Sequence, residues 1–342
     1  MAAPTDASRR NEVVRKSRRA EKAPSGGWRT IAAKELADHL GSTRFFVLLL
    51  IVALAAVVPL IFVSGTLSDQ APQVSGTPAL FMALFVLGSE QIGGITTVAF
   101  VAFLVPLVGI AFGFDAINSE RNQGTLARLL AQPVHRDDVV NGKFAAGIAV
   151  IALMLAAMVA FVAGAGIMRL GIIPGAEEFA RIIVWLLSTV LYASFWLAFA
   201  LLISVVVRGA ASAALIGFGT WLGLTLLGSY LLPIIASTFF PSDTSSFETF
   251  FASSSAQQLF LRLSPAQLYS DIQVAVLNPS VASVLGPGNL GQAISGQEAL
   301  PSLLSLDQSI LVVWPQIVLL VALTTAMFAL AYVLFLRQEV RA

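Results

Sequence analysis

The chain of 342 residues contains no cysteine and only two histidines, and charged residues make up only 11% of it. The lack of cysteine excludes disulfide bonds and thiolate metal sites. His39 and His135 are too few to build a histidine-rich metal site within one chain. A soluble domain carries about 25% charged residues, so this composition is not that of a soluble domain. We expect no metal, no cofactor and no nucleic-acid partner for this chain.

Long uncharged stretches take the place of the missing charge. Each has about 20 or more residues without Asp, Glu, Lys or Arg, which is enough for a helix to cross about 30 Å of hydrocarbon. In lipid the backbone groups must be paired within the segment, which requires helices. The sequence therefore predicts an all-α polytopic membrane protein with six spans: 45–64, 95–114, 144–168, 182–207, 210–233 and 310–336.

Basic residues predict the orientation of these spans. With both termini in the cytoplasm, 17 of the 20 Lys and Arg residues lie in cytoplasmic segments. The other three, Arg169, Arg181 and Arg262, lie outside. Acidic residues divide almost evenly and carry no signal. The positive-inside rule thus favours cytoplasmic termini, and we expect the cytoplasmic membrane of a prokaryote.

The composition of residues 1–27 predicts a disordered basic tail, and residues 28–342 are expected to form the membrane domain. The tail is either a solvated segment or a weak ligand of anionic lipid. Apolar residues then share one helical face from residue 28 onward: Trp28, Ile31, Leu36 and Leu40. This pattern predicts an interfacial helix that lies on membrane lipid with Trp28 as its anchor. The alternative is a longer first helix.

The predicted outer segments differ in length. The apolar run from Pro78 is too short to cross a membrane, so it is interfacial, re-entrant or packed on the bundle. Residues 169–181 predict a tight turn. The largest outer segment, 234–309, contains an amphipathic helical pattern between Pro265 and Pro279 that we expect to lie across the outer mouth.

No catalytic motif occurs in the chain. Gly142-Lys143 does not complete a phosphate-binding loop, because no glycine lies five positions before Gly142 and Phe144 follows the lysine. The predicted spans hold no ionisable side chain, whereas ion-coupled carriers need such groups inside the membrane. We expect a non-catalytic subunit, and a secondary carrier is disfavoured.

Small residues at four-residue spacing occur in two spans. They are Gly109 with Gly113, and Gly219 with Gly223. Such faces allow two helices to approach closely. They indicate either packing within the subunit or a dimer contact or pathway lining.

The polar segment 115–143 contains the most specific pattern. Leu126, Leu129 and Leu130 have the spacing of one helical face, and Pro133 ends that run. A second helix is expected to begin near Asp137 and to continue through Lys143 into the third span. We expect a helix, a proline turn and a second helix, parallel to the membrane at the cytoplasmic surface. The apolar face needs a groove on a partner or on the bundle.

This segment resembles the signature loop of ABC-2-type transporter permeases. The resemblance is carried by Glu120, Gly124, Leu126, Leu129, Leu130, Pro133 and Lys143. It extends to the helix before the first span, the six spans and the long outer segment between the fifth and sixth spans. The amino-acid sequence of the loop is most similar to the branch that includes permeases for nitrous-oxide-reductase maturation.

The resemblance implies a homodimer, or pseudo-dimer, of six-span subunits bound to two copies of a separate ATPase subunit. ATP and Mg²⁺ would be bound by that ATPase. Residues 120–133 would serve as the coupling helix that contacts it, and residues 28–41 as the interfacial connecting helix. The uncharged pathway favours export of amphipathic or lipid-like cargo. The alternative is a non-transporting scaffold or signal-transmitting subunit that acts on an outer partner.

Overall fold

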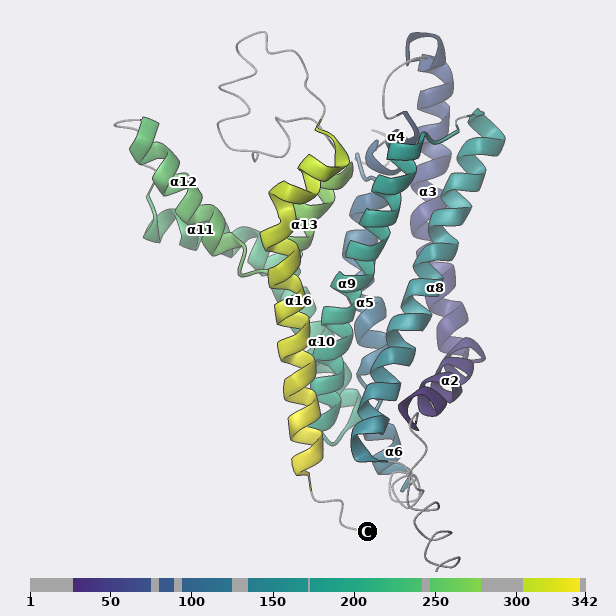
Figure 1. The fold of residues 1–342 in the computed structure, drawn as a ribbon, viewed down its shortest axis with the longest axis vertical. Coiled ribbons are helices and arrows are strands. Elements are labelled where there is room, and N and C mark those ends of the chain that lie inside the picture. Colours follow the sequence, from purple (N-terminus) through teal and green to yellow (C-terminus); the bar gives the residue numbers. More distant parts are fainter. Residues whose placement is uncertain are drawn as a thin grey trace, which may run out of the picture.

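The computed structural model describes residues 27–74, 80–88, 94–124, 135–171, 173–241, 247–277 and 304–338. These residues form helices and no strand (Figure 1). In chain order the elements are α2 (Gly27–Leu40), α3 (Thr43–Val74), α4 (Leu80–Val86), α5 (Thr97–Gly113), α6 (Asn118–Asn122), α8 (Arg136–Leu170), α9 (Ala176–Val206), α10 (Ala210–Leu222), the π-helical η2 (Gly223–Leu227), α11 (Gly228–Phe239), α12 (Phe247–Leu261), α13 (Pro265–Leu277) and α16 (Leu306–Arg337).

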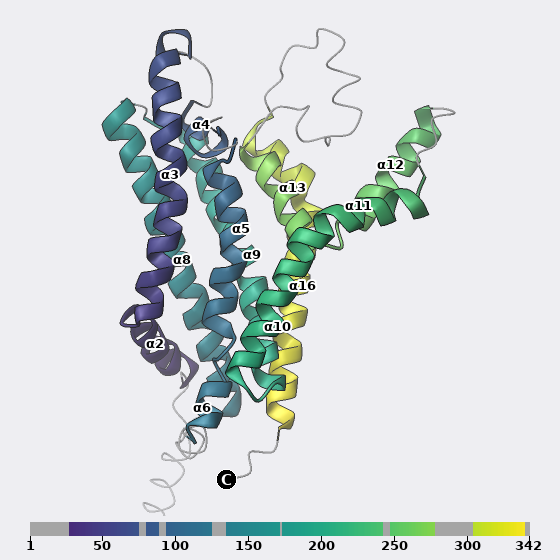
Figure 2. The same ribbon diagram turned by 180° about the vertical axis from the view of Figure 1, so that it is seen from behind.

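Six helical segments are long and apolar enough to cross a membrane. They cover residues 43–63, 97–122, 136–169, 176–206, 210–239 and 306–337. This result confirms the predicted all-α polytopic membrane fold. We call one end of the bundle the basal end. It contains α2, α6, the first turns of α8 and the last turns of α9 and α16, all at the bottom of Figures 1 and 2. The opposite end is the distal end.

Helix α9 lies at the centre of the bundle and packs against α5, α8, α13 and α16. In the most apolar 18-residue stretch of α9, 72% of the residues are buried, whereas only 6% are buried in the corresponding stretch of the segment 210–239. Glycines allow α5 to approach α9 closely. A Cβ added to Gly109 would lie 2.7 Å from the carbonyl oxygen of Ala193, and one added to Gly113 would lie 2.7 Å from the Cβ of Ala200. This pair therefore serves packing within the subunit.

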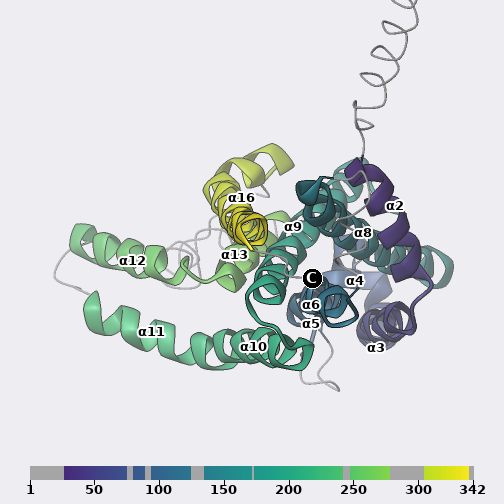
Figure 3. The same ribbon diagram turned by 90° about the horizontal axis from the view of Figure 1, so that it is seen from below.

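The segment α10–η2–α11 is the most exposed of the six. Figure 3 shows α11 and α12 extending side by side away from the other helices. Gly219 and Gly223 lie on this segment, and a Cβ on either would meet nothing within 4 Å. Within the described residues this glycine pair is not used for packing, unlike the pair on α5.

Two predictions about the distal segments are corrected by the structure. The turn predicted over 169–181 is shorter, because α8 continues to Leu170 and α9 begins at Ala176. Gly171 ends α8 with a φ of 67°, a conformation that favours glycine. Helix α13 does not lie across the outer mouth. It packs against α9 and α16, and its Leu268, Ile272 and Val276 are fully buried.

Helix α4 settles the open interpretation of the run from Pro78. Its Phe81, Met82, Leu84 and Phe85 are at most 3% exposed and belong to the main core cluster. The short helix therefore packs on the bundle, since it buries too much apolar surface for a solvated loop.

Candidate functional site

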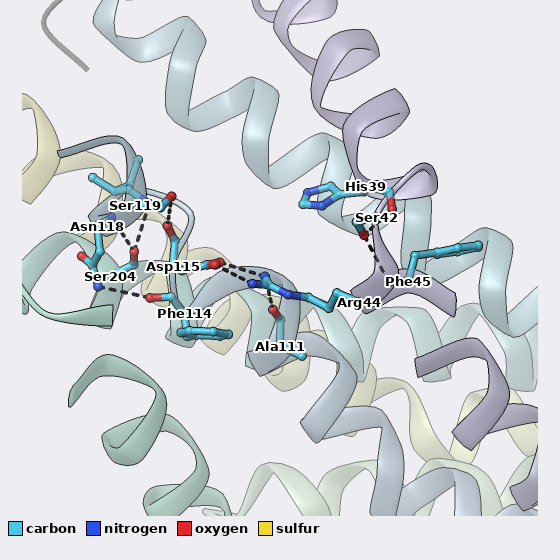
Figure 4. A network of polar contacts seen from close by, with 11 residues as sticks. His39, Ser42, Arg44, Phe45, Ala111, Phe114, Asp115, Asn118, Ser119 and Ser204 are labelled. Carbon is cyan, nitrogen blue, oxygen red and sulfur yellow. Dashed lines mark hydrogen bonds and ion pairs between the residues drawn. The ribbon is translucent and has the colours of Figure 1, made fainter. Parts of the chain in front are cut away.

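The polar segment between α5 and α8 begins at the basal end with the short helix α6. The hydroxyl oxygen of Ser204, on α9, accepts hydrogen bonds from the backbone N–H groups of Ile117 (3.0 Å) and Asn118 (3.2 Å). Asn118 in turn donates to the carbonyl of Phe114, and Ser119 donates to the carbonyl of Asp115 (Figure 4). Ser204 is fully buried, so the first turn of α6 is attached to the end of α9.

A bidentate ion pair joins α3 to the end of α5. The guanidinium of Arg44 donates to both carboxylate oxygens of Asp115, at 2.9 and 2.5 Å, and to the carbonyl of Ala111 at 2.9 Å. The same guanidinium lies 5.0 Å from the ring centroid of Phe114. Figure 4 shows Arg44 reaching across to this turn from the start of α3. Such fork-like pairing fixes orientation as well as distance.

A second ion-pair group joins α2, α6 and α8. Lys143 Nζ lies 2.7 Å from Glu120 Oε1 and 3.0 Å from Glu35 Oε1. The Lys143 side chain is only 6% exposed, and the two carboxylates are 17% and 12% exposed. One buried ammonium thus holds carboxylates from two other helices.

The last turns of α9 and α16 are attached to the same segment. Arg121 donates to the side-chain oxygen of Gln338 and to the carbonyl of Val205. The amide of Gln338 donates to Val205 (2.7 Å), and Arg136 donates to the carbonyl of Gln338 (3.2 Å). We call the contacts of Ser204, Arg44–Asp115, Lys143 and Gln338 the basal network.

His39 borders the basal network from α2. Its ring lies edge-on to Phe112, with 5.1 Å between the ring centroids. Burial lowers the pKa of His39 below the ordinary 6.5, and the nearby Lys143 and Arg44 lower it further against the opposing effect of Glu35 and Asp115. The imidazole is therefore held in its neutral form near neutral pH.

The predicted partner-contact residues divide into two sets. Glu120 and Gly124 are described: Glu120 turns toward Lys143, and Gly124 has a φ of 68°, which only glycine adopts easily. The other four, Leu126, Leu129, Leu130 and Pro133, lie outside the described residues. The role of all six as a contact for an ATPase stays a prediction.

The second predicted helix of this segment forms, but not as a separate element. His135 caps α8, and Asp138 accepts a hydrogen bond from the backbone N–H of His135. From Arg136 the helix runs without interruption to Leu170, so residues 136–143 are collinear with the third span. The prediction that this part lies parallel to the membrane is wrong, because no residue there breaks the helix.

The predicted interfacial helix exists as α2 and is distinct from α3. A turn at Gly41 and Ser42 separates them. Ile31 is buried, and Leu36 and Leu40 pack on the core, while Trp28 is 40% exposed. The apolar face is thus used largely against the bundle, and contact of Trp28 with lipid stays a prediction.

Several members of the basal network were not found from the sequence. They are Glu35, Arg44, Asp115, Ser204 and Gln338. One signal was present: Arg44 and Asp115 have opposite charge and border consecutive spans on the same predicted side. Such residues are candidates for an ion pair at the membrane edge. Within the described residues no group of three His, Asp or Glu side chains forms a metal site.

Residues 29–340 match the ABC-2 family transporter protein, so the chain belongs to that family of membrane transporters. Two relatives named probable ABC transporter permease protein NosY are similar to it. The one from Stutzerimonas stutzeri is 29% identical over 208 residues, covering 59% of this chain and 68% of that protein. The one from Pseudomonas aeruginosa is 29% identical over 204 residues, covering 58% and 66%. The chain is a multi-pass permease subunit of an ABC transporter.

Proposed function

We propose that this permease is driven by a separate ATPase that binds its basal end, and that it exports amphipathic or lipid-like cargo as a homodimer. The basal end is then cytoplasmic, in the inner membrane of a prokaryote. Two ATPase copies carry ATP and Mg²⁺. The single observation that carries the proposal is the attachment of the α5–α8 segment to α2, α3, α8, α9 and α16 through the basal network.

Through the basal network, a movement of this segment can be transmitted to the bundle. Its two ion-pair groups and the Ser204 cap are short contacts, so a displacement of α6 must move or break them. An ATPase pair that binds one arrangement of the segment better than another shifts the bundle between states by that difference in affinity. Attachment to several helices allows one displacement to reach both faces of α9.

The helix surfaces support the proposal of an amphipathic cargo. The described spans carry hydroxyl and aromatic side chains, whereas their charged groups lie near helix ends and are largely paired. A path of this kind offers little to an ion and favours an amphiphile. Transport then requires energy from another chain.

The proposal is tested at the predicted apolar face of the loop. Leu129→Asp or Leu130→Asp places an uncompensated charge in a desolvated contact, which costs several kcal/mol. The variant should insert into the membrane but should not co-purify with its ATPase. Arg128→Gln is the control, because helical spacing puts Arg128 off the face shared by Leu126, Leu129 and Leu130. Normal co-purification and normal stimulated ATP hydrolysis in both aspartate variants would refute the proposed contact.

Orientation and energy source are tested separately. Tags at either terminus or within 115–143 should be inaccessible from outside intact cells, and a tag within 242–300 should be cleaved by added protease. Transport into vesicles should stop on ATP depletion and survive collapse of the proton gradient. The opposite pair of results would make this chain a secondary carrier.

A second function is favoured by the extension of α11 and α12 away from the bundle (Figure 3). These helices offer a lever by which the ATPase cycle acts on an outer partner without transport. Deletion of 242–262 would then spare ATP hydrolysis and abolish binding of that partner. Loss of cargo movement alone would support the exporter.

A further inference from the structure

A pocket of about 320 Å³ lies where the π-helix η2 joins α11, beside the joint between α12 and α13. Its walls come from one membrane-spanning segment and from the two helices that follow it in the chain. The lining residues are Leu224, Thr225, Gly228, Ser229, Leu232, Pro233, Leu261, Ser264, Ala266, Gln267 and Ser270. None is charged, and five carry a hydroxyl or an amide.

The geometry points to a binding site for a neutral amphiphile that carries hydroxyl groups next to an alkyl chain. This inference names a site for the proposed amphipathic cargo and therefore rests on the proposed function. The pocket has the size of a small-molecule site, and its lining combines apolar walls with a few polar groups, as such sites do. The leucines, Pro233 and Ala266 provide a surface for an alkyl chain.

Three of the five polar side chains of the pocket have no hydrogen-bond partner among the described residues. Within the described residues, the hydroxyls of Thr225, Ser264 and Ser270 donate to no protein acceptor. Ser229 donates to the carbonyls of Thr225 and Leu226, and its oxygen keeps lone pairs that accept hydrogen bonds. A ligand that brings its own hydroxyl groups can therefore donate to these oxygens and accept from their O–H groups.

Charge beside the pocket is already neutralised. Asp271 accepts hydrogen bonds from Arg262 (3.1 Å) and from the side-chain amide of Gln267 (2.7 Å). The guanidinium thus faces a carboxylate rather than the pocket, and the amide oxygen of Gln267 faces away from Asp271. A phosphate or carboxylate headgroup would find no cation in the lining, whereas a hydroxyl group would find both donors and acceptors.

Local backbone structure shapes the pocket. In η2 the N–H of Gly228 bonds to the carbonyl of Gly223, a spacing of five residues instead of four. Such a π-helical turn widens the helix and is frequent at functional sites. Gly228 then leaves space where a side chain would stand, because a Cβ there would meet only Leu232 Cδ1, at 3.7 Å.

The test uses a monoacylglycerol with a photoactivatable diazirine in its acyl chain, and a lysophosphatidylglycerol with the same chain as the charged comparator. Both are added to the full-length permease in detergent micelles without ATP. Mass spectrometry of labelled peptides should place the monoacylglycerol on 224–233 and 261–270, with much weaker labelling by the charged probe.

Gly228→Leu fills the pocket and should reduce labelling of these peptides about tenfold, which corresponds to about 1.4 kcal/mol of binding free energy. Gly219→Leu is the matched control, because it adds the same side chain to open space on the same span outside the lining. If Gly228→Leu does not fold, Thr225→Val with Ser270→Ala removes two hydroxyls with little change in volume and should also weaken labelling.

Labelling spread over all lipid-facing helices, or equal loss in Gly228→Leu and Gly219→Leu, would overturn the inference. Equal labelling by the charged probe would overturn the inference that the pocket prefers a neutral ligand. These outcomes need no ATPase, so they are separable from the proposed function. Absent labelling in a permease that still binds its ATPase refutes the pocket alone, and labelling in a permease that binds no ATPase refutes the proposed coupling alone.

Discussion

Lys143 Nζ lies 2.7 Å from Glu120 Oε1, and this contact joins the first turn of the polar segment to the helix that follows it. The ammonium also contacts Glu35 of α2, so three helices meet at one buried cation. Both Glu120 and Lys143 belong to the pattern that resembles the ABC-2 signature loop. The structure gives that pairing a physical role: the two ends of the loop are held together at the bundle surface.

Lys143→Met should destabilise the protein, because it leaves two poorly solvated carboxylates beside each other without a cation. The expected loss in the free energy of unfolding is about 3 kcal/mol, and thermal unfolding in detergent measures it. Lys34→Met is the matched control: Lys34 also pairs with Glu35 and with Asp38, but its side chain is 62% exposed, so the loss should be below about 1 kcal/mol. Adding Glu120→Gln to Lys143→Met should restore part of the stability. Equal losses for both lysines would contradict the buried ion-pair group.

Gly113→Ala should destabilise the α5–α9 contact, since the new Cβ would lie 2.7 Å from Ala200 Cβ and 2.9 Å from the carbonyl oxygen of Leu197. Overpacking of this kind costs about 1–3 kcal/mol. Gly219→Ala should have the opposite sign, with a gain of up to about 1 kcal/mol, because its Cβ meets nothing and alanine favours a helix. Thermal unfolding of the isolated subunit measures both. A loss for Gly219→Ala only in the assembled complex would place that glycine at a subunit contact.

Arg181→Met should loosen the distal end. The Arg181 side chain is 2% exposed and donates to Glu177, to the carbonyls of Val276 and Leu304 and to Ser309, so it joins α9 to the end of α13 and the start of α16. Its loss should cost about 3 kcal/mol. The exposed Arg169 provides the control variant Arg169→Met, for which we expect no measurable change. Limited proteolysis should cut Arg181→Met faster near residue 304, and unchanged cleavage would argue against this role.

His39 makes stability depend on pH. The folded pKa of His39 is lowered by burial, so protonation favours the unfolded chain, and stability should fall as the pH drops through the unfolded value near 6.5. His39→Gln cannot take up the proton and should lose less stability between about pH 7.5 and about pH 5.5. Parallel unfolding curves for wild type and variant across that range would show that His39 does not contribute. Above the unfolded pKa, His39 should add nothing to the change of stability with pH.

The sequence determined the fold class and the approximate positions of the spans, because uncharged stretches of sufficient length have one stable form in lipid. It also determined the glycine pairs and the resemblance carried by Glu120, Gly124 and Lys143. It did not determine which glycine pair packs: Gly109 and Gly113 have the same spacing as Gly219 and Gly223 and differ only in the helix opposite them. Such a difference depends on which helices become neighbours.

Only the tertiary structure brought Arg44 to Asp115, Ser204 to α6 and Gln338 to Arg121. These contacts join residues far apart in the chain. Charge and predicted side make Arg44 and Asp115 candidates for an ion pair, but neither periodicity nor composition tells which residues meet. The same reason explains the burial of Arg181, which the sequence places at a loop and the folded chain places between the carbonyls of Val276 in α13 and of Leu304 just before α16. Local patterns determine where helices form in a membrane, whereas the packing of those helices decides which polar groups meet and where a pocket remains.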